Sequence, residues 1–112
     1  MLDWKTAILS LSLLLLLAGC GGDNAITIQT KGMVFDRETL TVKAGQPVSL
    51  GVINRDGYAH AFDMDEFDIH AALAAKETLT FSFTPDKPGR YEFYCGTPGH
   101  RMAGMVGTLV VE

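Results

Sequence analysis

The sequence predicts an all-β protein, a Greek-key β-sandwich of about seven to eight strands. Short segments in which apolar and polar residues alternate recur along the chain, and this pattern is typical of strands with one buried face. Clusters of Gly, Pro, Asn and Asp separate these segments, as expected for turns. With 112 residues, the chain is expected to form one domain.

The N-terminal segment is expected to lie outside this domain. A short polar start is followed by a Leu-rich run from Ala7 to Ala18, which has the length of a signal-peptide core and is short for a bilayer span. The run ends at Gly19-Cys20, and this pattern resembles the bacterial lipoprotein signal. We therefore predict a signal peptide over residues 1–19, with an uncleaved anchor helix as the alternative.

The lipoprotein resemblance implies that Cys20 carries the lipid, that residues 20–25 form a tether and that the domain occupies residues 26–112. The protein would then sit outside the cytoplasm, on the periplasmic or cell-surface face of a bacterial membrane. If Cys20 carries lipid, Cys95 has no disulfide partner, because the chain has two cysteines. A lone thiol in an oxidising compartment is a liability unless a metal occupies it.

Most strands of the domain can be placed from the alternation. They are expected at residues 26–29, 33–35, 40–43, 48–53, 78–84, 90–95 and 106–111. In the segment 90–95 the alternation directs Tyr91, Phe93 and Cys95 to the same inward face. Cys95 is therefore expected at the core end of a strand. Tyr91 is interpreted as a corner tyrosine of the sandwich.

The stretch from Tyr58 to Lys76 is predicted to be a long connection. Its Ala-rich part, residues 70–76, favours one short helix on propensity alone. Four acidic residues precede it, and we interpret them as a solvated loop, with a docking patch for a basic redox partner as the alternative. These residues are Asp63, Asp65, Glu66 and Asp68.

Three potential metal ligands recur at even spacing near the C-terminus. Four residues separate Cys95 from His100, and four separate His100 from Met105. A thiolate, imidazole and a weak thioether form a donor set that suits copper cycling between two oxidation states. A second imidazole must come from His60 or His70, and we favour His60 because it follows a turn in an alternating segment. Met102 is interpreted as a surface residue.

The chain from about Thr27 to Glu112 resembles the cupredoxins, the plastocyanin- and azurin-like blue copper proteins. The matching blocks are 40–45, Asn54 with His60 and Phe62, 88–95 and 100–107. The resemblance implies one mononuclear copper held by His60, Cys95, His100 and Met105.

Two features depart from the family pattern of plastocyanin. Four residues lie between the Cys and the loop His, as in azurin, whereas plastocyanin has two residues at this place. Ala61 follows the first His, where many relatives have Asn or Ser to tie the ligand loops together. The loop has one Cys, so the binuclear copper centre of oxidase subunits is excluded.

The sequence therefore predicts a membrane-tethered electron carrier and not an enzyme, with unidentified redox proteins as partners. The alternative is a copper carrier that delivers the metal to an oxidase or another receiver. A net charge of -4 without a basic cluster gives no indication of nucleic-acid binding. A monomer is expected.

Overall fold

The computed structural model describes residues 24–112. The predicted signal peptide at 1–19, Cys20 and most of the tether lie outside the described residues. The first strand begins at Asn24, two residues before the predicted start of the domain. In the described range, no helix is long and apolar enough to cross a membrane.

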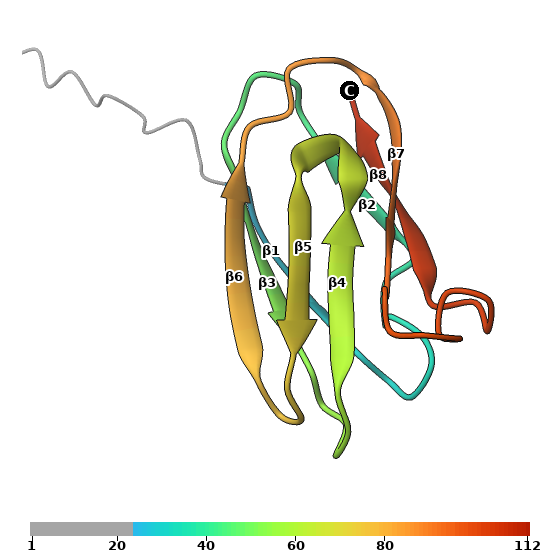
Figure 1. The fold of residues 1–112 in the computed structure, drawn as a ribbon. Helices are drawn as coiled ribbons and strands as arrows, with labels where there is room; N and C mark the ends of the chain where they lie inside the picture. The colour runs from blue at the N-terminus through green and yellow to red at the C-terminus, as the bar shows by residue number, and fades with distance from the viewer. Residues whose placement is uncertain (1–23) are drawn as a thin grey trace, which may run out of the picture.

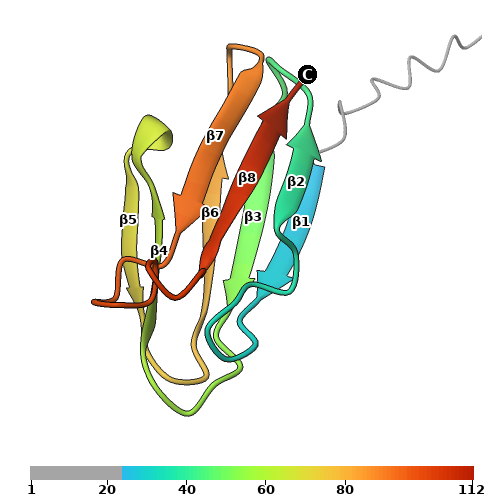
Figure 2. The same ribbon diagram turned by 90° about the vertical axis from the view of Figure 1, so that its right-hand side faces the viewer.

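Residues 24–112 form eight strands and one 3-10 helix (Figures 1 and 2). These elements are β1 (Asn24–Gln29), β2 (Thr39–Val42), β3 (Val48–Ile53), β4 (His60–Met64), η1 (Asp65–Phe67), β5 (Ile69–Leu73), β6 (Thr78–Phe83), β7 (Gly89–Tyr94) and β8 (Val106–Val111). One sheet has the order β1-β3-β6 and the other the order β2-β8-β7-β4-β5. The predicted all-β sandwich is therefore confirmed.

Both sheets are mixed, and their pairing places β1 beside β3 and the C-terminal strand β8 between β2 and β7. β1 pairs in parallel with β3, and β2 in parallel with β8, whereas the other pairs are antiparallel. Aromatic rings pack in the core between the sheets. The ring centroid of Phe35 lies 5.4 Å from that of Phe93 and 5.9 Å from that of Phe62. Edge-to-face packing of this kind adds to the free energy gained by burial.

The prediction of a long connection from Tyr58 to Lys76 with a helix at 70–76 is wrong, because this stretch contains strands β4 and β5. Five residue pairs join β5 to β4 in an antiparallel hairpin, from His60 opposite Leu73 to Met64 opposite Ile69. The turn of the hairpin uses η1 and Asp68, whose φ of 52° lies in the left-handed region. Burial of Ile69 and Leu73 on one face of the strand outweighs the helix propensity of the alanines.

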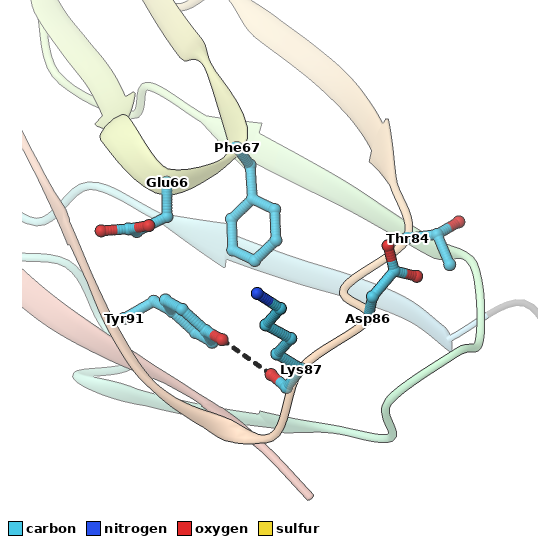
Figure 3. A pocket seen from close by; sticks show the side chains of 6 residues that line it. All are labelled: Glu66, Phe67, Thr84, Asp86, Lys87 and Tyr91. Atoms are coloured by element: carbon cyan, nitrogen blue, oxygen red, sulfur yellow. Dashed lines mark hydrogen bonds between the residues drawn. The ribbon is translucent and has the colours of Figure 1, made fainter.

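Strand β7 follows its predicted pattern and ends directly before Cys95. Phe93 and Cys95 are fully buried, and Tyr91 is partly buried on the same face. The Tyr91 hydroxyl donates a hydrogen bond to the Lys87 carbonyl at 2.7 Å, as expected for a corner tyrosine (Figure 3). This corner lines a pocket of about 310 Å³ together with Glu66 and Phe67 of η1. η1 lies at the opposite end of the sandwich from the start of β4 and the end of β7 (Figure 1).

Gly107 of β8 lies opposite Phe93 of β7, and the register leaves no room for a side chain there. A Cβ atom built at Gly107 would collide with the Phe93 ring. We predict that Gly107→Ala lowers the free energy of unfolding by about 1–3 kcal/mol, because the buried ring must shift. Chemical denaturation of the purified protein would measure this change.

Gly57→Ala is the matched control, since a Cβ at Gly57 meets nothing within 4 Å. Its unfolding free energy should change by less than about 1 kcal/mol. Equal effects of the two substitutions would contradict the packing of Phe93 against Gly107.

Candidate metal centre

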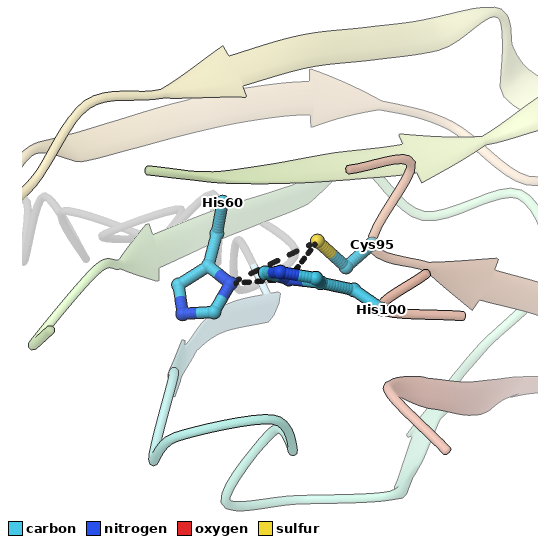
Figure 4. Close-up of side chains that lie close together, drawn as sticks. All are labelled: His60, Cys95 and His100. Carbon is cyan, nitrogen blue, oxygen red and sulfur yellow. Dashed lines mark hydrogen bonds between the residues drawn. The ribbon is translucent and has the colours of Figure 1, made fainter. Parts of the chain in front are cut away.

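Three donor atoms converge at one end of the sandwich (Figure 4). The Nδ1 atoms of His60 and His100 are 3.1 Å apart. The Cys95 Sγ atom lies 3.8 Å from His60 Nδ1 and 3.5 Å from His100 Nδ1. Among the described residues, His60, Cys95 and His100 are the His, Cys, Asp or Glu side chains whose donor atoms lie close enough together, as a group of three, to hold a metal ion.

The spacing of these atoms fits one metal ion. A circle through three points separated by 3.1, 3.5 and 3.8 Å has a radius of about 2.0 Å. Protein nitrogen and sulfur ligands bind first-row metals such as zinc at roughly 2.0–2.3 Å. Two imidazole nitrogens and one thiolate in a trigonal arrangement are the ligands of blue copper sites. The donors and their spacing therefore fit a copper ion.

His60 is positioned by its place at the start of β4 and by buried Asn54. His60 is 2% exposed as a residue and shares the buried face of β4 with Phe62 and Met64. Asn54 donates from Nδ2 to the carbonyls of Tyr58 (2.8 Å) and Ala74 (3.0 Å). These bonds connect the turn before β4 to the end of β5 and so fix where β4 begins.

The ligand loop from Cys95 to Met105 is held by its own backbone. The amide of His100 donates to Thr97 O at 3.0 Å, and the amide of Met105 donates to His100 O at 3.1 Å. The amide of Cys95 donates to Met105 O at 3.0 Å and closes the loop at its base. Gly99 and Gly104 have φ values of 81° and 103°, which favour glycine. The loop is thus shaped independently of any ligand.

Met105, the predicted axial ligand, is fully buried at the base of this loop. Its backbone is hydrogen-bonded to both Cys95 and His100, so Met105 lies next to these two residues in the fold. Met102, in contrast, is 94% exposed. This agrees with its interpretation as a surface residue.

The Cys95 sulfur accepts a hydrogen bond from the backbone of β4. The donor is the amide of Ala61, at 3.3 Å from Sγ. Ala61 has no side chain that could form a hydrogen bond between the loops. Asp63, two residues further along β4, makes such a bond, because its Oδ2 accepts the amide proton of Gly96 at 2.9 Å. A Cβ at Gly96 would collide with this carboxylate, so the glycine is required for the contact. Sequence reasoning missed this role of Asp63.

Asp56 is a second carboxylate that sequence reasoning missed. Its Oδ2 lies 2.8 Å from Nε2 of His60, on the side of the ring away from Cys95. Burial alone would raise the pKa of Asp56, but hydrogen bonds from Thr30, His60 and Gly32 hold the pKa below its usual value.

His70, the alternative second imidazole, lies away from the other donors on the surface of β5. Its Nδ1 is 3.0 Å from Asp63 Oδ1, and its side chain is 49% exposed. Asp63 thus contacts both His70 and Gly96 and belongs to strand β4, where a solvated loop was expected. Asp65 accepts the Tyr94 hydroxyl proton at 2.8 Å, and this bond raises the pKa of Tyr94. Asp68 is fully exposed.

The outer edge of the donor group is formed by the partly exposed His100 and by Tyr58. The Tyr58 ring is 47% exposed, and its centroid lies 4.9 Å from the His60 ring and 6.4 Å from the His100 ring. Tyr58 was not expected in the site. Pro98, Ala103 and Gly104 of the ligand loop are also exposed.

The comparisons with known proteins agree with this fold and donor set. The chain matches the family described as Cupredoxin-like domain over residues 6–111. It is 34% identical over 121 aligned residues to plastocyanin of Prochlorothrix hollandica, covering 91% of this chain and 89% of that protein. It is also 31% identical to the copper-resistant cuproprotein CopI of Rubrivivax gelatinosus, covering 76% of this chain and 64% of CopI.

Among solved structures, auracyanin A of Chloroflexus aurantiacus, described as a "blue" copper protein, aligns with a TM-score of 0.71 and 25% identity. This alignment covers 81% of this chain and all of that one. The protein therefore belongs to the cupredoxin-like family. Family membership and the donor set confirm the prediction of one copper ion as the cofactor.

The contact between His70 and Asp63 makes stability depend on pH. The hydrogen bond from His70 to Asp63, together with the neighbouring carboxylates, raises the pKa of His70 above its ordinary value of 6.5. The stabilisation is thus fully present below about pH 6.5 and is lost as the pH rises through the raised pKa. We predict that His70→Gln removes this part of the pH dependence of unfolding.

Urea denaturation at about pH 5.5 and about pH 8.5 would measure the effect. The unfolding free energy of the wild type should exceed that of His70→Gln at the lower pH by more than at the higher pH. A difference between the two proteins that stays constant, or grows with pH, would contradict the assignment.

Proposed function

We propose that this protein carries single electrons through one type 1 copper held by His60, Cys95, His100 and Met105. The observation that carries the proposal is the convergence of two imidazole nitrogens and a thiol sulfur within a buried site. Copper bound to such ligands supplies one-electron chemistry between Cu(I) and Cu(II).

The way the ligands are held suits electron transfer. Cys95 follows a core strand, His60 begins another, and His100 lies in a loop closed by backbone hydrogen bonds. Ligands fixed in this manner rearrange little when the charge of the metal changes. Cys95 and Met105 are fully buried, so water has poor access to the sulfur side of the site.

Electrons would enter and leave at the exposed edge of His100. This ring is partly exposed, and the small or apolar residues Pro98, Ala103 and Gly104 around it are exposed. A redox partner protein could approach this end of the sandwich closely. The exposed carboxylates of Asp65 in η1 and of Asp68, which follows η1, could attract a basic partner electrostatically.

We further propose that the domain acts outside the cytoplasm, tethered to a bacterial membrane by a lipid on Cys20. The sequence before the domain supports this location. A bound metal would protect Cys95, the free cysteine of residues 24–112, from oxidation there. In this function the protein catalyses no reaction, and the domain would act as a monomer.

Copper delivery is a second candidate function, with two observations in its favour. The chain resembles CopI, a copper-resistant cuproprotein. The fully exposed thioether of Met102 stands two residues after His100, where a soft ligand could meet Cu(I) during transfer. Loss of copper to a moderate chelator separates the two functions. Slow loss favours the electron carrier, and rapid loss favours delivery.

The role of Cys95 is tested by visible spectroscopy of the Cu(II)-loaded protein. We predict an intense thiolate-to-copper band that bleaches on addition of ascorbate and returns on reoxidation. Cys95→Ser should abolish the band, because the serine hydroxyl cannot supply a thiolate donor.

Met102→Leu is the control for a general disturbance of the ligand loop, since this side chain is almost fully exposed. It should leave the band unchanged. An intense visible band that survives in Cys95→Ser would overturn the copper assignment at this residue.

A further inference from the structure

Asp56 is not one of the four predicted ligands, but it contacts His60 on the side of the ring that faces away from Cys95 and His100. The His60 ring directs Nδ1 toward Cys95 and His100, and Nε2 toward Asp56 (Figure 4 shows the Nδ1 side). The distance from Nε2 to Asp56 Oδ2 is 2.8 Å. The His60 side chain is fully buried and that of Asp56 is 19% exposed. The pair is therefore largely shielded from water.

The Asp56 carboxylate is itself held in place by several donors. The Thr30 hydroxyl donates to Oδ2 at 2.8 Å, and the amide of Gly32 donates to Oδ1 at 3.2 Å. The backbone amide of Asp56 donates to Oδ1 of buried Asn54 at 2.9 Å. These bonds connect the β1 end of the sandwich to the turn before β4. The carboxylate thus has one defined orientation relative to His60.

This contact selects one tautomer of His60. An ionised carboxylate can only accept hydrogen bonds, so the proton of a neutral His60 ring must lie on Nε2. The lone pair then lies on Nδ1, the atom that faces Cys95 and His100. Hydrogen bonds of this kind fix the orientation of metal-binding histidines and raise their basicity.

The charge of Asp56 also acts on the metal. A carboxylate one imidazole ring away from the site attracts the more highly charged ion more strongly, and partial burial limits the screening by water. Its effect on Cu(II) must therefore exceed its effect on Cu(I).

We propose that Asp56 is a positioning residue that presets Nδ1 of His60 for copper and biases the site toward Cu(II). The inference rests on copper binding by His60 but not on whether the protein transfers electrons or delivers copper. A purely structural role, in which Asp56 only joins Thr30 and Gly32 to the turn, is the competing explanation.

The charge effect is tested with Asp56→Asn, which keeps the shape of the side chain and an oxygen that can accept from Nε2. Competition with chelators specific for each oxidation state would give the Cu(II) and Cu(I) affinities. We expect the Cu(II) affinity to fall by about 10–100-fold, with a smaller change for Cu(I). Each tenfold fall in the Cu(II) affinity relative to the Cu(I) affinity raises the reduction potential by about 59 mV.

Asp36→Asn is the matched control. Asp36 lines the same pocket of about 390 Å³ as Asp56, and its carboxylate accepts the amide proton of Gln29 at 2.9 Å without contacting His60. The control makes the same change in net charge and should leave the affinity ratio near the wild-type value. A folded Asp56→Asn protein with the same ratio as Asp36→Asn would overturn the bias toward Cu(II).

A metal-free measurement covers the case in which Asp56→Asn does not fold. Long-range ¹H–¹⁵N NMR correlations of the wild-type apoprotein, at a pH where His60 is neutral, report which ring nitrogen carries the proton. We expect the proton on Nε2 of His60, and a proton on Nδ1 would overturn the positioning role. This measurement contains no copper, so it tests the positioning role whether or not the protein binds copper. Failure of the wild-type protein to bind copper would instead refute the proposed function.

Discussion

The metal site depends on the point at which β7 ends. Phe93 is seated in the core over Gly107, and this contact fixes the position of the next inward-facing residue, Cys95. The amide of Ala61 then approaches the Cys95 sulfur because β4 runs beside β7 in the same sheet. His60 precedes Ala61, so the contact that places the sulfur also places the first imidazole. Core packing thus determines the spacing of two potential donor residues that are far apart in sequence.

Three polar side chains around the donors provide contacts that the ligand loop alone does not make. Asp63 connects β4 to Gly96, Asn54 fixes the turn before β4, and Asp56 accepts from the back of His60. Each is buried or partly buried, and each has hydrogen-bond partners in the described part of the chain. Satisfied networks of this kind rigidify the groups they contact. The arrangement therefore holds the imidazole and thiol groups close together through contacts within the protein.

Alternation and turn chemistry were sufficient to predict the sandwich, six of its strands, the inward direction of Cys95 and the corner role of Tyr91. They failed for β4 and β5, because the alanines around His70 favour a helix locally and only the pairing of the two strands reveals the hairpin. The strand expected at 33–35 was also wrong, since Phe35 makes only an isolated bridge to Thr30. The convergence of Cys95 and His100 could be expected from their spacing. The roles of Asp56, Asp63 and Tyr58 could not, since each depends on a contact made by folding. Acidic residues in polar segments gave no sign of burial.

The central claim is that the fold presets one ligand group for both oxidation states of copper. X-ray absorption at the copper edge, recorded on the Cu(II) protein and again after reduction, tests this claim most directly. The account predicts one sulfur from Cys95 and two imidazole nitrogens at short distance in both states, with little change between them. Loss of the short sulfur contribution, or of a nitrogen ligand on reduction, would contradict it.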